Sequence, residues 1–213
     1  GIVAVTGYKK AVPLLMNGLE KLEYRGYDSA GIAIINSETN SITCKKAEGK
    51  LKNLINNLTD KNIPGTVGIG HTRWATHGKP EVKNAHPQTD SSGNIAVVQN
   101  GIIENFRNLK SKLEQEGVVF SSDTDTEVIP HLIQRELNTL SKLNLENNGS
   151  TLLVAVRNVI SDLEGSYALA VLWSGAPTSI VVARKQAPLI IGLGEGEFIC
   201  ASDTPAITNF TNI

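Results

Sequence analysis

The sequence IAVVQNGIIE occupies residues 95–104 and changes from apolar to polar in its middle. The β-branched run at its start predicts a buried strand over residues 95–99. The pair Asn100-Gly101 follows, and a helical pattern begins at residue 103. Asn-Gly is typical of a tight hairpin turn. An Asn amide beside a Gly N–H is also a good oxyanion hole, because glycine lets a ligand approach the backbone closely. Both interpretations stay open on local grounds.

The apolar pattern on either side of this stretch predicts an α+β fold. Strands cluster towards the two ends of the sequence and strict β-α-β alternation is missing, so two packed sheets with helices outside are favoured over a doubly wound parallel sheet. No boundary divides residues 1–213, and the polar segment 73–93 is predicted to be a long functional loop. The predicted strands are 1–7, 31–36, 42–46, 66–71, 95–99, 166–173, 178–184, 188–192 and 197–201, and the predicted helices are 10–22, 50–58, 103–116, 124–140 and 151–162.

The composition narrows the class of protein. Hydrophobic residues make up 40% and charged residues 19% of the sequence, as in a globular domain with a real core. The net charge of −1 gives no reason to expect nucleic acid or a membrane surface as a partner. Two cysteines, Cys44 and Cys200, are too few for a disulfide framework and favour a reducing compartment, the cytoplasm. The histidines lack metal-site spacing, so we expect neither a metal nor a cofactor.

The motif HTRWATHG covers residues 71–78, where a strand is predicted to run into the long loop. An arginine at the end of a strand presents a planar fork that suits a carboxylate. On this interpretation Arg73 binds the acid group of a ligand. The alternative is a surface arginine beside a packed tryptophan, Trp74.

The motif SDTDTE covers residues 122–127 and opens a predicted helix. Its Ser, Thr and Asp residues can cap that helix, with Asp123 or Thr124 as the cap residue. One aspartate is then left over, and Asp125 could bind an ammonium group. Together with Arg73 and the pair Asn100-Gly101, it would supply what a free amino acid needs for attack on its amide: a cation, an anion and an oxyanion hole. A nucleophile is missing from this set.

Five motifs in register carry a resemblance to a known family. They are LEYRGYDSAG at 22–31, HTRWATHG at 71–78, NAHP at 84–87, NGIIEN at 100–105 and TDTE at 124–127. Together they resemble the glutaminase domain of the glutamine–fructose-6-phosphate aminotransferases, the glucosamine-6-phosphate synthases, over essentially the whole chain. The resemblance implies an N-terminal-nucleophile hydrolase fold, a four-layer αββα sandwich. It also implies hydrolysis of L-glutamine to L-glutamate and ammonia.

The resemblance assigns roles to the three polar features. It implies that Arg73 holds the α-carboxylate of glutamine and that Asp125 holds its α-ammonium group. Asn100 and Gly101 are expected to form the oxyanion hole. In the family an amino-terminal cysteine, exposed by removal of methionine, attacks the side-chain amide and uses its own α-amine as the base.

Further positions follow from the same resemblance. Trp74, Thr76 and His77 lie where the family has a loop that closes over glutamine, with Trp74 near the ammonia exit. Arg25 resembles a residue at the interface towards the synthase half. In the family, that half isomerises fructose 6-phosphate and accepts the ammonia. It also provides most of the contacts that hold the homodimer together.

The nucleophile is expected immediately before Gly1, outside the sequence, and neither Cys44 nor Cys200 is placed to replace it. As written, the chain is therefore expected to be inactive. Two alternatives stay open. One is an amino-acid sensor that binds without hydrolysis. The other is the glutaminase domain of a different amidotransferase, such as the first enzyme of purine synthesis or asparagine synthetase.

Overall fold

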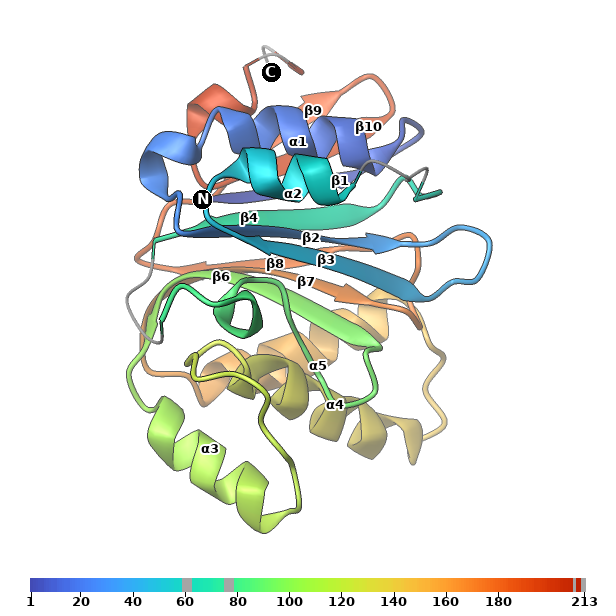
Figure 1. Ribbon diagram of the computed structural model, residues 1–213. Coiled ribbons are helices and arrows are strands. Elements are labelled where there is room, and N and C mark those ends of the chain that lie inside the picture. Colours follow the sequence, from blue (N-terminus) through green and yellow to red (C-terminus); the bar gives the residue numbers. More distant parts are fainter. Residues whose placement is uncertain (59–62, 75–78, 209, 212–213) are drawn as a thin grey trace.

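Two antiparallel sheets pack face to face, with helices covering both outer faces, in the computed structural model (Figure 1). The structure describes residues 1–58, 63–74, 79–208 and 210–211. The layers are therefore helix, sheet, sheet and helix, which confirms the predicted four-layer α+β sandwich. In the described part of the chain, no helix has the length and apolar character to cross a membrane.

The first sheet has six strands in the order β3-β2-β4-β1-β10-β9. Its central strand β1 pairs with β4 on one side and with β10 on the other, so both chain ends contribute to one sheet. Helices α1 (Ala11–Glu20) and α2 (Leu51–Asn57) cover its outer face. The strands are β1 (Ile2–Thr6), β2 (Ser29–Ile35), β3 (Ile42–Glu48), β4 (Gly68–Arg73), β9 (Ile190–Gly194) and β10 (Glu197–Ala201).

The second sheet has four strands in the order β5-β6-β7-β8. Helices α4 (Val128–Ser141) and α5 (Gly149–Ser161) pack on its outer face, and α3 (Phe106–Gln115) lies beside them. Its strands are β5 (Gln88–Thr89), β6 (Ile95–Ile103), β7 (Gly165–Trp173) and β8 (Val181–Lys185), and short 3-10 helices occur at η1 (Glu23–Arg25), η2 (Val82–Asn84) and η3 (Thr204–Ala206).

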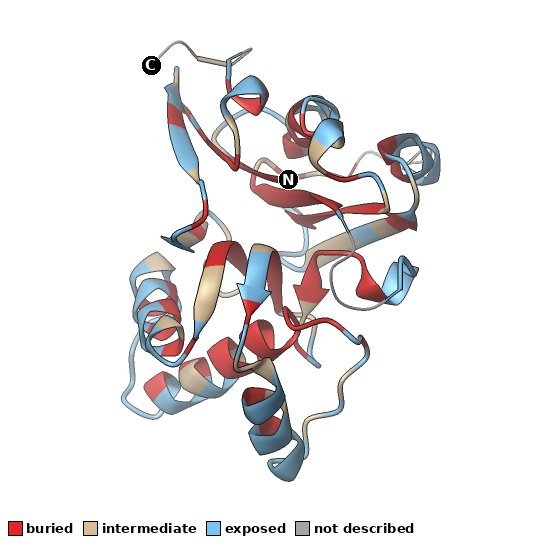
Figure 2. Cartoon of the chain, turned by 90° about the vertical axis from the view of Figure 1, so that its left-hand side faces the viewer, coloured by how far each residue is buried: buried red, intermediate tan, exposed pale blue. Residues whose placement is uncertain are grey.

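Central strands are apolar on both faces because each face meets another layer. In β1, Val3 and Val5 join the core under α1, whereas Ile2 and Ala4 join the core between the sheets. This alternation follows from the two-residue period of a strand. Figure 2 shows the buried residues concentrated in the sheets and on the inner sides of the helices. Gly18 of α1 lies against Val3, where an added Cβ would come within 2.9 Å of a Val3 methyl group, so helix and strand pack closely.

Strand β6 is longer than predicted. The predicted strand ended at residue 99 and the predicted helix began at 103, but β6 continues to Ile103 and α3 begins at Phe106. Pairing with β7 extends without a break from Ile95 to Ile103, including Asn100 opposite Ala168. The hairpin-turn interpretation of Asn100-Gly101 is therefore wrong. The tertiary pairing outweighs the local turn preference.

The predicted helix over 124–140 begins later, at Val128, and Glu127 is its cap residue without a side-chain cap hydrogen bond. Asp123 and Thr124, the predicted cap residues, lie outside the helix: the side chain of Asp123 bonds to Asn84, and the hydroxyl of Thr124 bonds to that of Ser122. The predicted loop over 73–93 contains η2 and the short strand β5. Its residues 75–78 lie outside the described part of the chain.

Replacing Ile69 by Ala tests the packing between the sheets. Ile69 of β4 is fully buried in the core between them, so the variant loses buried apolar area and leaves a cavity. The free energy of unfolding, measured by urea titration, should fall by about 2–5 kcal/mol. The exposed Val119 offers a control, since Val119→Ala should change it by less than about 0.5 kcal/mol. Equal losses in the two variants would contradict the proposed core.

Candidate functional site

A cavity of about 290 Å³ opens where β1 begins and β4 ends in the first sheet, and where β6 of the second sheet carries Asn100 and Gly101. It brings together residues from distant parts of the sequence, including all three polar features singled out above. The residues that line it are Gly1, Arg25, His71, Thr72, Arg73, Trp74, His86, Gln99, Asn100, Gly101, Ile102, Thr124 and Asp125.

Arg73 is the last residue of β4 and is only 4% exposed, so the alternative of a surface arginine is wrong. Burial lowers the pKa of its guanidinium, and the nearby carboxylates of Asp125 and Asp28 act in the opposite direction. An arginine nevertheless keeps its charge at any physiological pH. One guanidinium nitrogen donates to the carbonyl oxygen of Lys79 at 3.4 Å. The site therefore holds a positive charge on the wall of a partly enclosed cavity.

Asp125 supplies the opposite charge and is also buried. Its Oδ2 accepts a hydrogen bond of 2.8 Å from the backbone N–H of Ile103 at the end of β6. This bond ties the carboxylate to the rigid sheet although the residue itself lies in an irregular segment. The cavity thus offers a cation, Arg73, and an anion, Asp125, as a zwitterionic amino acid requires.

Asn100 and Gly101 lie on β6 beside the charged pair. The Oδ1 atom of Asn100 is 3.0 Å from Nε2 of His71 on β4. Gly101 has φ of 95°, and a Cβ added there would lie 2.0 Å from the carbonyl oxygen of Ser166. Only glycine fits this backbone without strain. The positive φ interrupts the regular strand geometry at the point where the strand meets the cavity.

Two histidines that sequence analysis considered only as metal ligands line the cavity. His71 and His86 are buried, and their rings stack with centroids 4.3 Å apart. Burial, and then neighbouring positive groups, hold the pKa of both well below the usual value, so both are neutral at pH 7. The sequence could have indicated His71 as a site residue. Residues two apart on a strand share a face, and His71 precedes Arg73 by two positions.

Two further predicted site residues, Trp74 and Arg25, also line the cavity. Trp74 is 59% exposed at the cavity, and its ring lies 5.7 Å from that of Tyr27. Arg25 also lines the cavity and forms an ion pair of 2.8 Å with Asp203. Thr76 and His77 fall outside the residues that the structure describes.

Gly1 continues the β1–β4 ladder into the cavity. Its nitrogen donates to the carbonyl oxygen of Thr72 at 2.6 Å, and the N–H of Thr72 donates back to the oxygen of Gly1 at 3.0 Å. A backbone amide would make the same bond. A Cβ at this position would meet the side chain of Leu22 at 2.7 Å, so the site requires glycine.

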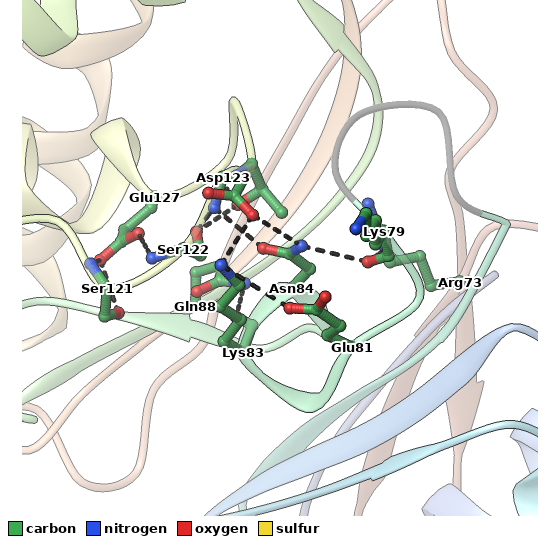
Figure 3. A network of polar contacts seen from close by, with 11 residues as sticks. Arg73, Lys79, Glu81, Lys83, Asn84, Gln88, Ser121, Ser122, Asp123 and Glu127 are labelled. Carbon is green, nitrogen blue, oxygen red and sulfur yellow. Dashed lines mark hydrogen bonds and ion pairs between the residues drawn. The ribbon is translucent and has the colours of Figure 1, made fainter.

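A polar network joins the segment after β4 to the segment that carries Asp125 (Figure 3). The buried Asn84 donates to the carbonyl oxygen of Lys79 at 3.1 Å and to Asp123 at 3.2 Å, and its Oδ1 accepts from the N–H of Asp123 at 2.9 Å. Lys83 adds an ion pair of 2.9 Å with Asp123. Arg73 and Asp125 are therefore held by connected segments.

Glu127 organises the other end of this network. It accepts hydrogen bonds from the N–H groups of Ser121 and Ser122 at 2.8 and 2.6 Å. Burial alone would raise the pKa of Glu127, but His131 and the two serines outweigh burial and lower it to about 2. The acidic motif at 122–127 therefore stabilises a loop, and helix capping by Asp123 or Thr124 is a wrong prediction.

Comparison with known proteins decides the family. Residues 71–209 match the family model for the glutamine amidotransferase domain. The chain belongs to this family. It is 54% identical over 211 residues to the glutamine–fructose-6-phosphate aminotransferase (isomerizing) of Thermosynechococcus vestitus, covering 99% of this chain and 32% of that protein. The relative of the same name in Clostridium tetani is 50% identical over 211 residues, with 99% and 33% covered. The chain thus spans about a third of the length of these curated relatives.

Solved structures of amidotransferases share the fold. The glutamine phosphoribosylpyrophosphate amidotransferase of B. subtilis, complexed with ADP and GMP, aligns with a TM-score of 0.78 and 29% identity over 97% of this chain and 42% of that one. A structure described as the allosteric regulatory enzyme of purine biosynthesis gives 0.80 and 30% with the same coverage. The predicted N-terminal-nucleophile hydrolase fold is confirmed.

Replacing Gly101 by Ala tests the backbone at the cavity. The new Cβ would meet the oxygen of Ser166 at 2.0 Å and the φ of 95° would be strained. The free energy of unfolding should fall by more than about 1 kcal/mol. Gly93, which has φ of 70° and nothing within 4 Å of an added Cβ, is the control. Its alanine variant should lose less, and equal losses would show that the clash is absent.

Replacing Glu127 by Gln tests the loop anchor through pH. The pKa of Glu127 is lowered from 4.5 to about 2, so its ionised form stabilises the fold fully above pH 4.5. This stabilisation is lost as the pH falls through 2. Unfolding by urea should show the variant a few kcal/mol less stable at pH 6, with a difference that shrinks between pH 4.5 and 2. The exposed Glu114 is the control, and Glu114→Gln should change the free energy of unfolding at pH 6 by less than about 0.5 kcal/mol.

Proposed function

We propose that the full-length protein hydrolyses the side-chain amide of L-glutamine in this cavity, giving L-glutamate and ammonia. The ammonia would serve the synthesis of glucosamine 6-phosphate from fructose 6-phosphate. One observation carries the proposal: a single cavity beside Gly1 joins Arg73, Asp125 and the pair Asn100-Gly101. A cation, an anion and an oxyanion hole are the groups that a free amino acid needs for attack on its side-chain amide.

The two charges suit the main-chain end of glutamine. Arg73 can bind the α-carboxylate through two parallel N–H groups, and Asp125 can accept from the α-ammonium group. Both side chains are buried, so their interactions with a bound ligand are screened less than those at a surface. With the main-chain end fixed, the side-chain amide extends towards Asn100, Gly101 and the nitrogen of Gly1.

The proposed nucleophile is a cysteine bonded to the nitrogen of Gly1, as the family resemblance implies. Its thiol sulfur attacks the amide carbon while its α-amine takes the thiol proton. The tetrahedral intermediate expels ammonia, which leaves with that proton, and a γ-glutamyl thioester remains. Water then attacks the thioester, releasing glutamate and restoring the thiol. The amide of Asn100 and the N–H of Gly101 are proposed to stabilise the oxyanion in both steps.

The two cysteines within the chain are poor candidates for the nucleophile. Neither lines the cavity. Burial raises the pKa of Cys200 to about 12 and raises that of Cys44 as well, so the reactive thiolate is scarce at neutral pH. This supports a nucleophile located ahead of Gly1.

The surrounding residues complete the proposal. Trp74, Thr76 and His77 would close over bound glutamine, with Trp74 beside the ammonia exit, and Arg25 would face the synthase part. Residues 1–213 would form one glutaminase domain of a cytoplasmic homodimer whose sugar-isomerase domains bind fructose 6-phosphate. The identity of 54% to an aminotransferase that uses fructose 6-phosphate by name, against 29–30% to the purine enzymes, supports this acceptor.

Glutamine hydrolysis by the full-length protein tests the proposal, with the residue before Gly1 identified by mass spectrometry. Arg73→Ala should raise KM about 100-fold, which is ~3 kcal/mol, since the variant leaves the ligand carboxylate unpaired in a buried site. Arg107→Ala, which removes an exposed arginine of α3, is the matched control and should leave KM unchanged.

The outcomes separate the alternatives. Glutamine binding by calorimetry without release of glutamate would favour the sensor. Ammonia transfer to 5-phosphoribosyl diphosphate but not to fructose 6-phosphate would favour a purine-type amidotransferase. Equal KM values for Arg73→Ala and Arg107→Ala would remove Arg73 from the substrate site.

A further inference from the structure

We propose that His71, braced by the ring of His86, is a positioning residue that turns the Asn100 amide so that its NH2 group faces the cavity. This inference rests on the proposed function, because it concerns how the oxyanion hole is set. His71 would act only through Asn100 and would not touch the reacting atoms. The contact joins the two sheets at the wall of the cavity.

The contact links two separate layers. His71 lies on β4 of the six-stranded sheet, two residues beyond Ile69, whose side chain fills the core between the sheets. Asn100 lies on β6 of the four-stranded sheet, two residues beyond Val98 of the same core. Both polar side chains therefore extend into the layer between the sheets, and they meet at 3.0 Å between Nε2 and Oδ1.

The hydrogen bonds of His86 fix its tautomer. The backbone N–H of Gln99 donates to Nδ1 of His86 at 3.2 Å, so the ring proton must be on Nε2. Nε2 lies 3.2 Å from Oγ1 of Thr126, and that hydroxyl in turn donates to the side-chain oxygen of Gln99. The chain of donors leaves the His86 ring in one orientation, and its face forms a rigid support for His71.

The position of the proton on His71 follows from its two neighbours. Nδ1 of His71 has no hydrogen-bond partner in the described part of the protein, whereas Nε2 faces the oxygen of Asn100. A buried N–H without an acceptor costs more than an empty lone pair. The proton is therefore placed on Nε2, where it donates to Oδ1 of Asn100.

This bond distinguishes the two ends of the Asn100 amide. With Oδ1 held by His71, the NH2 group is directed away from His71, and Asn100 lines the cavity. A flipped amide would present its oxygen to the developing negative charge and would repel it. Losing one oxyanion donor typically lowers kcat by about 10²–10³-fold. An unbraced Asn100 that spends time flipped should lose part of this factor.

Two substitutions at His71 in the full-length protein provide the test. His71→Phe keeps a flat ring that can stack on His86 but cannot donate, so kcat for glutamine hydrolysis should fall about 100-fold with KM changed less than about 3-fold. His71→Gln keeps an N–H donor and should recover most of kcat. Val156→Ala, which removes buried volume from α5 far from the cavity, should lower stability without changing kcat.

A double-mutant cycle with Asn100→Ala then separates positioning from general disruption. If His71 acts through Asn100, His71→Phe should cause no further loss of kcat in the Asn100→Ala background. A full 100-fold loss in that background would overturn the proposal, as would a failure of His71→Gln to exceed His71→Phe.

Nitrogen-15 NMR of the histidines provides a readout that does not depend on activity. We expect His71 to be neutral with its proton on Nε2 at pH 7, and a proton on Nδ1 would overturn the proposal. A wild-type protein without glutaminase activity would instead refute the proposed function, and the tautomer would still show whether His71 donates to Asn100.

Discussion

The face-to-face packing of the two sheets is the constraint on which the cavity depends. The layer between them combines alanines, such as Ala4, Ala33 and Ala96, with larger apolar side chains, such as those of Ile69 and Leu172. At one end this layer changes from apolar to polar, where His71 of β4 meets Asn100 of β6. Because the strands fix these positions, the polar groups keep their spacing without support from a ligand.

The site contains both charged and neutral titratable side chains. Arg73 keeps its positive charge, whereas burial holds the pKa of His71 and of His86 well below the usual value and keeps both rings neutral at pH 7. A protonated histidine there would place a second cation beside Arg73 and would compete for Asp125. Neutral rings avoid this conflict and still provide one donor each, which is what an amide and a hydroxyl require.

Sequence patterns predicted the layers, because these depend on local spacing, and they singled out Arg73 and Asp125, which the fold brings to one cavity. Apolar alternation located nine of the strands within a few residues, and Arg73 and Asp125 followed from the needs of one ligand. The predictions that were wrong concern residues whose structure is set by partners distant in sequence. The continuation of β6 past Asn100 is set by β7, more than sixty residues later. Likewise, the acidic motif resembles a helix cap, and only the fold shows Asp123 bonded to Asn84 and Glu127 bonded to Ser121.

The buried side chain of Asn84 has a consequence for the thermodynamics of ligand capture. By bonding to Lys79 on one side and Asp123 on the other, it orders both flanking segments as the protein folds. The loss of conformational entropy in these segments then belongs to folding and is not subtracted from affinity. A small zwitterion has few atoms with which to offset such a loss. Because the segments are already ordered, two charged side chains can bind such a ligand with little further loss of conformational entropy.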